Sequence, residues 1–163
     1  MHTLILMRHA KSDYPPGVDD RQRPLSARGE RDAEEAGRWM HMMYPRIDVV
    51  LVSPAVRAQQ TWSRVEAHLD SGQVRMEPKI YEDWGSGLSQ LIATTLGPTV
   101  QLTLVVGHNP GIEDLARRWS YEDSSGDRAR MMKKFPTCGI AVLTLESGWV
   151  GPGALQTFTV PRG

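Results

Sequence analysis

The chain alternates short apolar runs with longer amphipathic stretches. Three apolar runs have the length and composition of buried strands: residues 4–7, 48–52 and 100–106. Four stretches repeat apolar residues at helical spacing: residues 26–43, 53–69, 88–96 and 109–119. A weaker run at 74–80 predicts an edge strand, because Pro78 within it cannot donate to a neighbouring strand. Strands and helices that alternate in this way are typical of a mostly parallel sheet.

Side chains that can cap a helix stand at the start of three of these stretches. Ser26, Ser53 and Asn109 are each predicted as an N-cap, since a short polar side chain there accepts from a free backbone N–H. Pro54 and Pro110 follow two of them, and proline is favoured in the first helical turn. Two of the helices should therefore begin directly behind a strand.

Two segments lack a periodic pattern, and the end of the chain returns to strands. Residues 13–24 are rich in proline and charge and should form a loop over the sheet edge, and residues 121–137 predict a mobile loop with at most a helical turn. Strands are expected at 139–145 and 154–160. Because their connection is too short for a crossover helix, they predict an antiparallel hairpin at one edge.

The fold class that follows is α/β. We expect a three-layer sandwich, with a mostly parallel central sheet, helices on both faces and an antiparallel C-terminal edge hairpin. A length of 163 residues suits one domain, residues 1–163, and no internal repeat interrupts it.

Composition excludes several classes of function. Basic and acidic side chains balance at 19 each, so bulk charge gives no reason to expect nucleic acid as a partner. Cys138 is the only cysteine, which rules out an intramolecular disulfide and a thiolate zinc site. No apolar run reaches the length of a signal-peptide core or a membrane span. We therefore expect a cytoplasmic protein without a membrane partner.

Chemically useful residues follow three of the predicted strands. Arg8 and His9 come after the first, Arg57 lies in the first turn after the second, and His108 follows the strand at 100–106. Since the carboxyl ends of parallel strands meet at one sheet edge, these four side chains should share a crevice. Arginines that hold phosphoryl oxygens beside an imidazole that attacks phosphorus suit phosphoryl transfer. Each residue taken alone also has a purely structural explanation. Arg8 and His9 could be a charged strand end, Arg57 a solvated cation and His108 a capped core histidine.

Four segments carry a resemblance to a known family: LMRHAKS at 6–12, RPLSARG at 23–29, SPAVRAQQT at 53–61 and GHNPG at 107–111. Together, in this order and spacing, they resemble the histidine phosphatase superfamily, and within it the small bacterial phosphohistidine phosphatases of the SixA type. The resemblance implies that His9 is the nucleophile that becomes phosphohistidine. It implies that Arg8 and Arg57 bind phosphate and that His108 is the second pocket histidine. Alanine after the nucleophile, here Ala10, is a mark of the small subgroup.

The proton donor is an open question at this stage. Family members commonly place an acidic residue after the third strand, which makes Glu82 the candidate and Asp83 its competitor. An acidic turn that faces water is the structural alternative, and some small relatives lack the acid. Ser12 and Asn109 are further candidates for substrate binding.

The leading hypothesis is a phosphatase that acts on phosphohistidine of a protein partner, such as a histidine phosphotransfer protein, through a covalent enzyme intermediate. A small-molecule phosphomonoesterase is the enzymatic alternative, and a phosphate-dependent binding module without turnover is the alternative from another class. No cofactor or metal is expected, because no carboxylate or thiolate cluster accompanies the four residues. A monomer is favoured.

Overall fold

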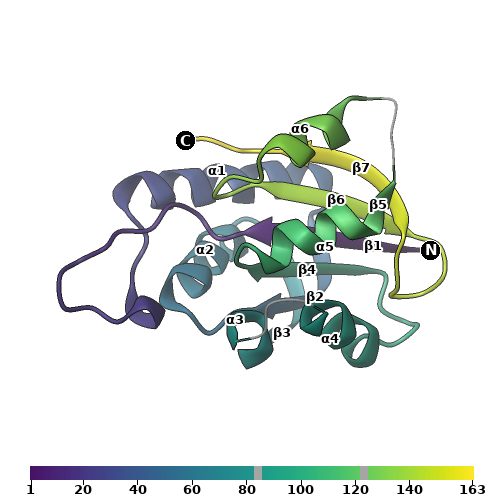
Figure 1. Ribbon diagram of the computed structural model, residues 1–163, viewed down its shortest axis with the longest axis horizontal. Coiled ribbons are helices and arrows are strands. Elements are labelled where there is room, and N and C mark those ends of the chain that lie inside the picture. Colours follow the sequence, from purple (N-terminus) through teal and green to yellow (C-terminus); the bar gives the residue numbers. More distant parts are fainter. Residues whose placement is uncertain (83–85, 122–124) are drawn as a thin grey trace.

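The computed structural model describes residues 1–82, 86–121 and 125–163. Within them lies one sheet with the strand order β3-β2-β4-β1-β6-β7-β5 (Figure 1). Its strands are β1 (His2–Arg8), β2 (Arg46–Val52), β3 (Asp70–Met76), β4 (Leu102–Gly107), β5 (Ser120–Tyr121), β6 (Ile140–Leu145) and β7 (Gly153–Thr159). The helices are α1 (Ala27–Met43), α2 (Val56–Glu66), α3 (Pro78–Glu82), α4 (Gly87–Thr95), α5 (Gly111–Trp119) and α6 (Asp127–Lys133), with a 3-10 turn η1 (Asp20–Gln22).

The pairing within the sheet confirms the predicted fold class. β3, β2, β4 and β1 pair parallel to one another, whereas β6 pairs antiparallel with both β1 and β7. The hairpin of β6 and β7 is thus antiparallel as predicted, and the two-residue β5 adds a short parallel pairing outside it.

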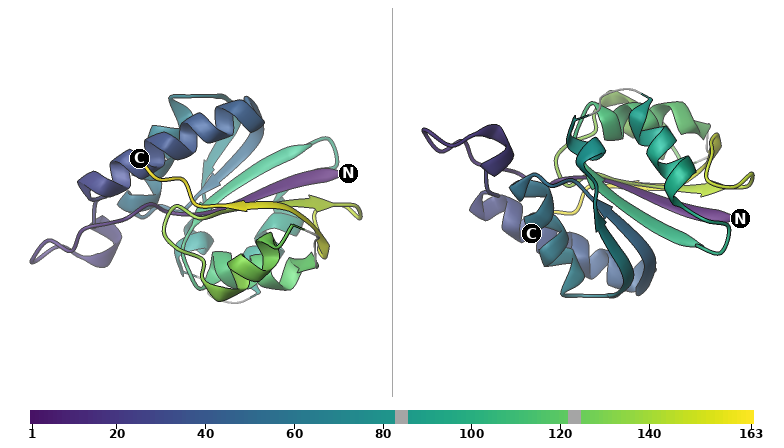
Figure 2. Two further views of the ribbon diagram at one scale, coloured as in Figure 1. Left: turned by 90° about the horizontal axis from the view of Figure 1, so that it is seen from above. Right: turned by 90° about the horizontal axis from the view of Figure 1, so that it is seen from below.

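Helices cover both faces of the sheet (Figure 2). α1 and α2 pack on one face, and α4, α5 and α6 lie on the other. Along β1 the side chains alternate between the two cores: Leu4 and Leu6 join the cluster on the α4–α5 side, while Ile5 and Met7 join the other. All four are fully buried, which explains why a strand covered on both faces reads as an unbroken apolar run.

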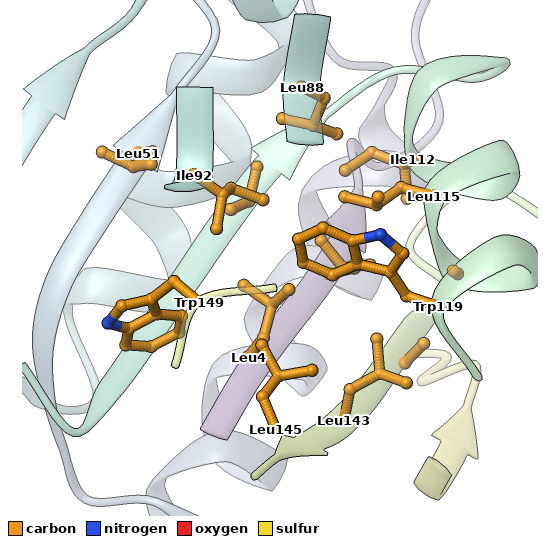
Figure 3. Packing of buried hydrophobic residues seen from close by; sticks show 14 of the residues in the cluster. Leu4, Leu51, Leu88, Ile92, Ile112, Leu115, Trp119, Leu143, Leu145 and Trp149 are labelled. Carbon is orange, nitrogen blue, oxygen red and sulfur yellow. The ribbon is translucent and has the colours of Figure 1, made fainter. Parts of the chain in front are cut away.

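The core on the α4–α5 side is large and includes Trp119 and Trp149 (Figure 3). Leu88 and Ile92 of α4 and Ile112 and Leu115 of α5 point into it. Complete burial of a side chain of this size contributes roughly 1.5–3 kcal/mol. Packing therefore holds α4 and α5 against the sheet, which fixes where their first residues lie.

The third strand was misplaced by the sequence pattern. It spans Asp70–Met76, so the prediction of a strand at 74–80 was wrong at both ends. Pairing with β2 defines it, and its mostly exposed, polar sequence has no apolar alternation to reveal it. It is an edge strand as predicted, but Pro78 is not the reason, because Pro78 begins α3, where its missing N–H is tolerated.

Two predicted helix caps also need correction. α2 begins at Val56 with Ala55 at the cap position, so Ser53 does not cap it. α5 begins at Gly111 with Pro110 at the cap position; Asn109 stands one residue earlier, and its Oδ1 accepts from the backbone N–H of Glu113 at 3.3 Å. Ser26 does cap α1, with its Oγ accepting from the N–H of Gly29 at 3.0 Å.

Between 121 and 137 the chain forms more structure than predicted. α6 occupies Asp127–Lys133, and Met131 on it is fully buried in the core. Residues 122–124 lie outside the described part of the chain. In the described residues, no helix is both long and apolar enough to cross a membrane.

Candidate active site

The carboxyl ends of β1, β2 and β4 meet at one edge of the sheet. Val106 of β4 is in register with Met7 of β1 on one side and with Val52 of β2 on the other. The residues immediately beyond these positions therefore emerge side by side. They include Arg8 at the end of β1, His9 after it, Ser53 after β2 and His108 after β4.

The hydrogen-bond partners of the two ring nitrogens of His9 fix its tautomer. Its Nδ1 lies 2.7 Å from the backbone oxygen of Ala10, which can only accept, so Nδ1 carries the proton. Its Nε2 then accepts a hydrogen bond from Nε–H of Arg57 at 3.3 Å. Burial lowers the pKa of His9 to about 3, and electrostatic interaction with His108 and Arg57 adds to this, although the bond to Ala10 opposes it. The ring is thus neutral at pH 7, with a lone pair on Nε2.

His108 packs against His9, with 5.1 Å between the ring centroids. Its Nε2 lies 2.7 Å from Oγ of Ser53, and that Oγ also accepts from the backbone N–H of Ala55 at 3.2 Å. The Ser53 hydroxyl proton is therefore free to donate to Nε2 of His108. The other ring nitrogen of His108, Nδ1, is buried and has no hydrogen-bond partner among the described residues. Burial, reinforced by the charge of Arg57, lowers the pKa of His108 to about 4.

Arg57 bridges the histidines and the loop that precedes α1. Besides Nε, which faces His9, its NH1 donates to the backbone oxygen of Asp20 at 2.7 Å and its NH2 donates to Oδ2 of Asp20 at 3.1 Å. Thr61 fixes the first turn of α2 against β1, because its Oγ1 donates to the oxygen of Arg57 at 2.7 Å and accepts from the N–H of Ala10 at 3.0 Å. The guanidinium is therefore positioned from both sides.

Asp20 is a site residue that the sequence did not single out. Its carboxylate accepts from NH2 of Arg57, from the Tyr81 hydroxyl at 2.8 Å and from Nε of Arg23 at 3.0 Å. Partial burial raises the pKa of Asp20, but these three donors together outweigh it and lower the pKa to about 2. Its spacing of three from Arg23 is the one local signal that could have drawn attention to it.

Arg8 and Asn109 share a backbone acceptor. NH1 of Arg8 donates to the oxygen of Phe135 at 3.1 Å, and Nδ2 of Asn109 donates to the same oxygen at 2.9 Å. Burial lowers the pKa of Arg8, against opposing contributions from Glu113 and Tyr14. The Nε of Arg8 is buried without a hydrogen-bond partner among the described residues, so it has a donor to offer.

A cavity of about 510 Å³ opens in front of these groups. It is lined by Asp20, Arg57, Tyr81, Glu82, His108 and Asn109. Because Arg57 and His108 both contact His9, the nucleophile candidate lies directly behind the cavity wall. A phosphoryl group inside the cavity would have a guanidinium and an imidazole in its lining.

The remaining predicted site residues differ in their placement. Glu82 ends α3 and lines the cavity with an exposed side chain. Its competitor Asp83 lies outside the described residues. Ser12 is buried, and its Oγ accepts from NH1 of Arg23 at 3.1 Å. It is not among the residues that line the cavity.

The described residues contain no group of three or more His, Cys, Asp or Glu side chains that could hold a metal ion. The positive charges at the site are those of arginine, which repels a cation and attracts an anion. Guanidinium and imidazole groups such as those of Arg57 and His108 are suited to the oxygens of an anion.

Comparison with known proteins identifies the family. The model of the Histidine phosphatase superfamily (branch 1) matches residues 4–94. The uncharacterized protein Rv1276c of Mycobacterium tuberculosis is 41% identical over 165 residues, covering 96% of this chain and 100% of the relative. A candidate phosphohistidine phosphatase SixA from Nakamurella multipartitia has a TM-score of 0.85 at 30% identity, covering 99% of this chain and 97% of that one.

A second candidate SixA, from Agrobacterium tumefaciens, gives a TM-score of 0.84 at 28% identity and covers 98% of each chain. The segment matched by the family model contains His9 and Arg57, and the relatives span the rest of the fold, including the His108 helix. This chain therefore belongs to the histidine phosphatase superfamily, branch 1.

Proposed function

We propose that this protein is a phosphatase that hydrolyses phosphohistidine on a protein partner, with His9 as the nucleophile. One observation carries the proposal. Nε2 of His9 is unprotonated, faces a guanidinium N–H and lies behind a cavity lined by Arg57 and His108. A nucleophilic lone pair beside fixed cationic and neutral donors is what attack on phosphorus needs.

In the first step, Nε2 of His9 attacks phosphorus. A new P–N bond forms to Nε2, and the bond between phosphorus and the leaving group breaks with its electron pair going to that group. Arg57 exchanges its contact with Nε2 for a phosphoryl oxygen, so the same N–H that holds the lone pair in the resting site neutralises charge during transfer. The backbone oxygen of Ala10 keeps the ring oriented and stabilises the positive charge that develops on it.

His108 contributes a donor to the transferring group. The Ser53 hydroxyl can donate to Nε2 of His108, and in that tautomer the ring proton of neutral His108 resides on Nδ1, which has no hydrogen-bond partner among the described residues. That N–H is available to a phosphoryl oxygen. In the second step, water attacks the phosphorus of phosphorylated His9, the P–N bond to Nε2 breaks and inorganic phosphate departs.

The similarity to the two candidate SixA proteins supports a phosphohistidine substrate over other phosphates. The chemistry supports it as well, because the P–N bond of phosphohistidine is labile and its leaving imidazole needs little protonation. Transfer from one histidine to another then depends mainly on positioning and charge neutralisation.

A small-molecule phosphomonoesterase is the second candidate function, and Glu82 is the observation that favours it. An alkoxide is a poor leaving group and requires a general acid. Glu82 lines the same cavity as Arg57 and His108, so a carboxylic acid is within the space that a leaving group would occupy.

The two functions are separated by a substrate comparison. The protein should be incubated with a phosphorylated histidine phosphotransfer protein and with a panel of sugar phosphates and nucleotides, and kcat/KM compared. We expect the phosphoprotein to give the highest value; a sugar phosphate or nucleotide that exceeds it would make the esterase the better description. Phosphate binding without turnover of any substrate would identify a binding module instead.

Catalysis should also proceed without a metal. We expect full activity after exhaustive chelation, since two arginines perform the charge neutralisation that a divalent ion would otherwise supply. Activity lost in chelator and restored by a single added metal would overturn this part of the proposal.

A further inference from the structure

The two halves of the cavity carry opposite charge. Toward His9 the wall is basic, because the guanidinium of Arg57 lines the cavity there and contacts His9. At the mouth it is acidic, with the carboxylates of Asp20 and Glu82 lining the same cavity. A cavity that only had to bind a polyanion tightly would be lined by arginine without carboxylates. The acidic side chains at the mouth therefore need another role.

Hydrogen bonds hold the carboxylate of Asp20 in a fixed position in the site. Its Oδ2 accepts from both Arg57 and Tyr81, and its Oδ1 accepts from Arg23, so donors from three separate segments hold one exposed loop carboxylate over the cavity. When Arg57 turns to a phosphoryl group, Tyr81 and Arg23 still keep the carboxylate in place. Donors of this kind favour the ionised form, so Asp20 presents a fixed negative charge.

The leaving group of a substrate must lie on this acidic side. In-line attack places it on the far side of phosphorus from Nε2 of His9. Because His9 is buried behind Arg57 and His108, the far side is the exposed side of the cavity, which the exposed side chains of Asp20 and Glu82 line. These carboxylates therefore attract or repel the leaving group according to its charge, while the arginines bind the phosphoryl oxygens.

We propose that Asp20 is a specificity-determining residue that selects phosphoryl substrates with a cationic or neutral leaving group and disfavours those with an anionic one. The inference rests on the phosphatase function proposed above and assigns to Asp20 the preference for a phosphoimidazole over substrates with an anionic leaving group.

The bond changes fit this class. When the second nitrogen of a phosphoimidazole is protonated, the leaving group carries a positive charge before transfer. The P–N bond breaks, its electron pair stays on the leaving nitrogen, and the new P–N bond forms to Nε2 of His9. The imidazolium departs as neutral imidazole with its remaining N–H, so no proton has to be donated, and Asp20 contributes by charge alone.

The test uses two aryl phosphates that differ only in a ring substituent, aminomethyl in one and carboxymethyl in the other. The measured quantity is the ratio of their kcat/KM values. Opposite charges a few ångströms from a carboxylate near a protein surface should change this ratio by roughly tenfold. We expect the wild type to prefer the cationic substrate and Asp20→Asn to lose most of that preference, with the loss smaller at high salt.

Matched variants separate charge from structure. Asp19→Asn removes the neighbouring exposed carboxylate, which is not among the residues that line the cavity, and should leave the ratio unchanged. Asp20→Glu retains the charge and should retain the preference. An equal loss on both substrates in Asp20→Asn would mean that the residue only positions Arg57, and would overturn the inference. Hydrolysis of neither substrate by the wild type, with phosphohistidine also untouched, would instead contradict the phosphatase function itself.

Discussion

The inner and outer parts of this site are built in different ways. Inside, His9 and His108 are imidazoles whose pKa values lie well below the usual one, chiefly because of burial. One backbone oxygen orients His9, and a serine hydroxyl orients His108. Outside, Asp20 and Glu82 are exposed carboxylates on a loop and at the end of a short helix. The inner groups follow from the sheet, whereas the outer ones depend on side-chain contacts between distant segments. We expect the inner part to perform the transfer and the outer part to select the leaving group.

Arg57 belongs to both parts. Its Nε contacts His9 in the inner part, while its NH1 and NH2 contact Asp20 in the outer part. A change at Arg57 should therefore disturb both parts, and a change confined to one part should leave the other intact. Four predictions use this division.

The largest effect is expected from His9→Ala. It should abolish turnover and leave the fold intact, because the residue stands beyond the end of β1 and reacts as the nucleophile. Rapid acid quench of the wild type with labelled substrate should give acid-labile phosphate on His9. Label on another residue, or no label in a quench fast enough to precede hydrolysis, would contradict the mechanism.

Arg57→Ala should lower kcat/KM by at least a hundredfold, on the order of 3 kcal/mol, because charge-assisted bonds to the transferring group are lost. Lysine should restore only part of this, since its ammonium cannot replace a planar fork of donors. Arg64→Ala is the control, because Arg64 lies on the outer face of α2 and pairs with Glu30 at 3.4 Å. Kinetics like those of the wild type in Arg57→Ala would reduce Arg57 to a structural residue.

Glu82→Gln should affect the outer part selectively. Hydrolysis of an alkyl phosphate should fall by roughly a hundredfold or more, the size of a general-acid contribution, while phosphohistidine and aryl phosphates change much less. The chemical step should be followed by single turnover, because phosphate release can mask it. A selective loss in Asp83→Asn instead would move the donor by one residue, and no selective loss in either variant would remove the carboxylic acid from the mechanism.

The smallest effect concerns stability and the inner histidines. Their pKa values in the folded protein are about 3 for His9 and about 4 for His108, below the value of about 6.5 in an unfolded chain, so between these values the unfolded chain binds more protons. The free energy of unfolding should therefore fall as pH drops from 7 to 5, by on the order of 2 kcal/mol for each ring.

Urea denaturation of His9→Gln at the two pH values tests this. The variant should lose less stability than the wild type on acidification, because it removes one of the two rings that stay unprotonated. His41→Gln, which alters an exposed histidine on α1, serves as the control and should lose as much as the wild type. Equal pH dependence in all three proteins would mean that burial does not keep His9 neutral.

The sequence by itself determined the central sheet and the inner groups. β1 and β4 are buried on both faces, so each reads as a continuous apolar run, and a charged residue at the end of such a run can only emerge at the sheet edge. Arg8, His9 and His108 could therefore be placed without a structure. The α/β class followed from the same runs.

Only the tertiary structure decided where β3 begins and what Asp20 and Ser53 do. β3 is an exposed edge strand whose backbone pairing with β2 leaves no periodic pattern in its side chains. Asp20 stands in an aperiodic loop, and its position depends on donors 3, 37 and 61 residues away. Ser53 was predicted as a helix cap because its local sequence suits one, yet its hydroxyl contacts His108, 55 residues further along. Hydrophobic burial leaves a mark on the neighbouring sequence, whereas a hydrogen bond between distant side chains leaves none.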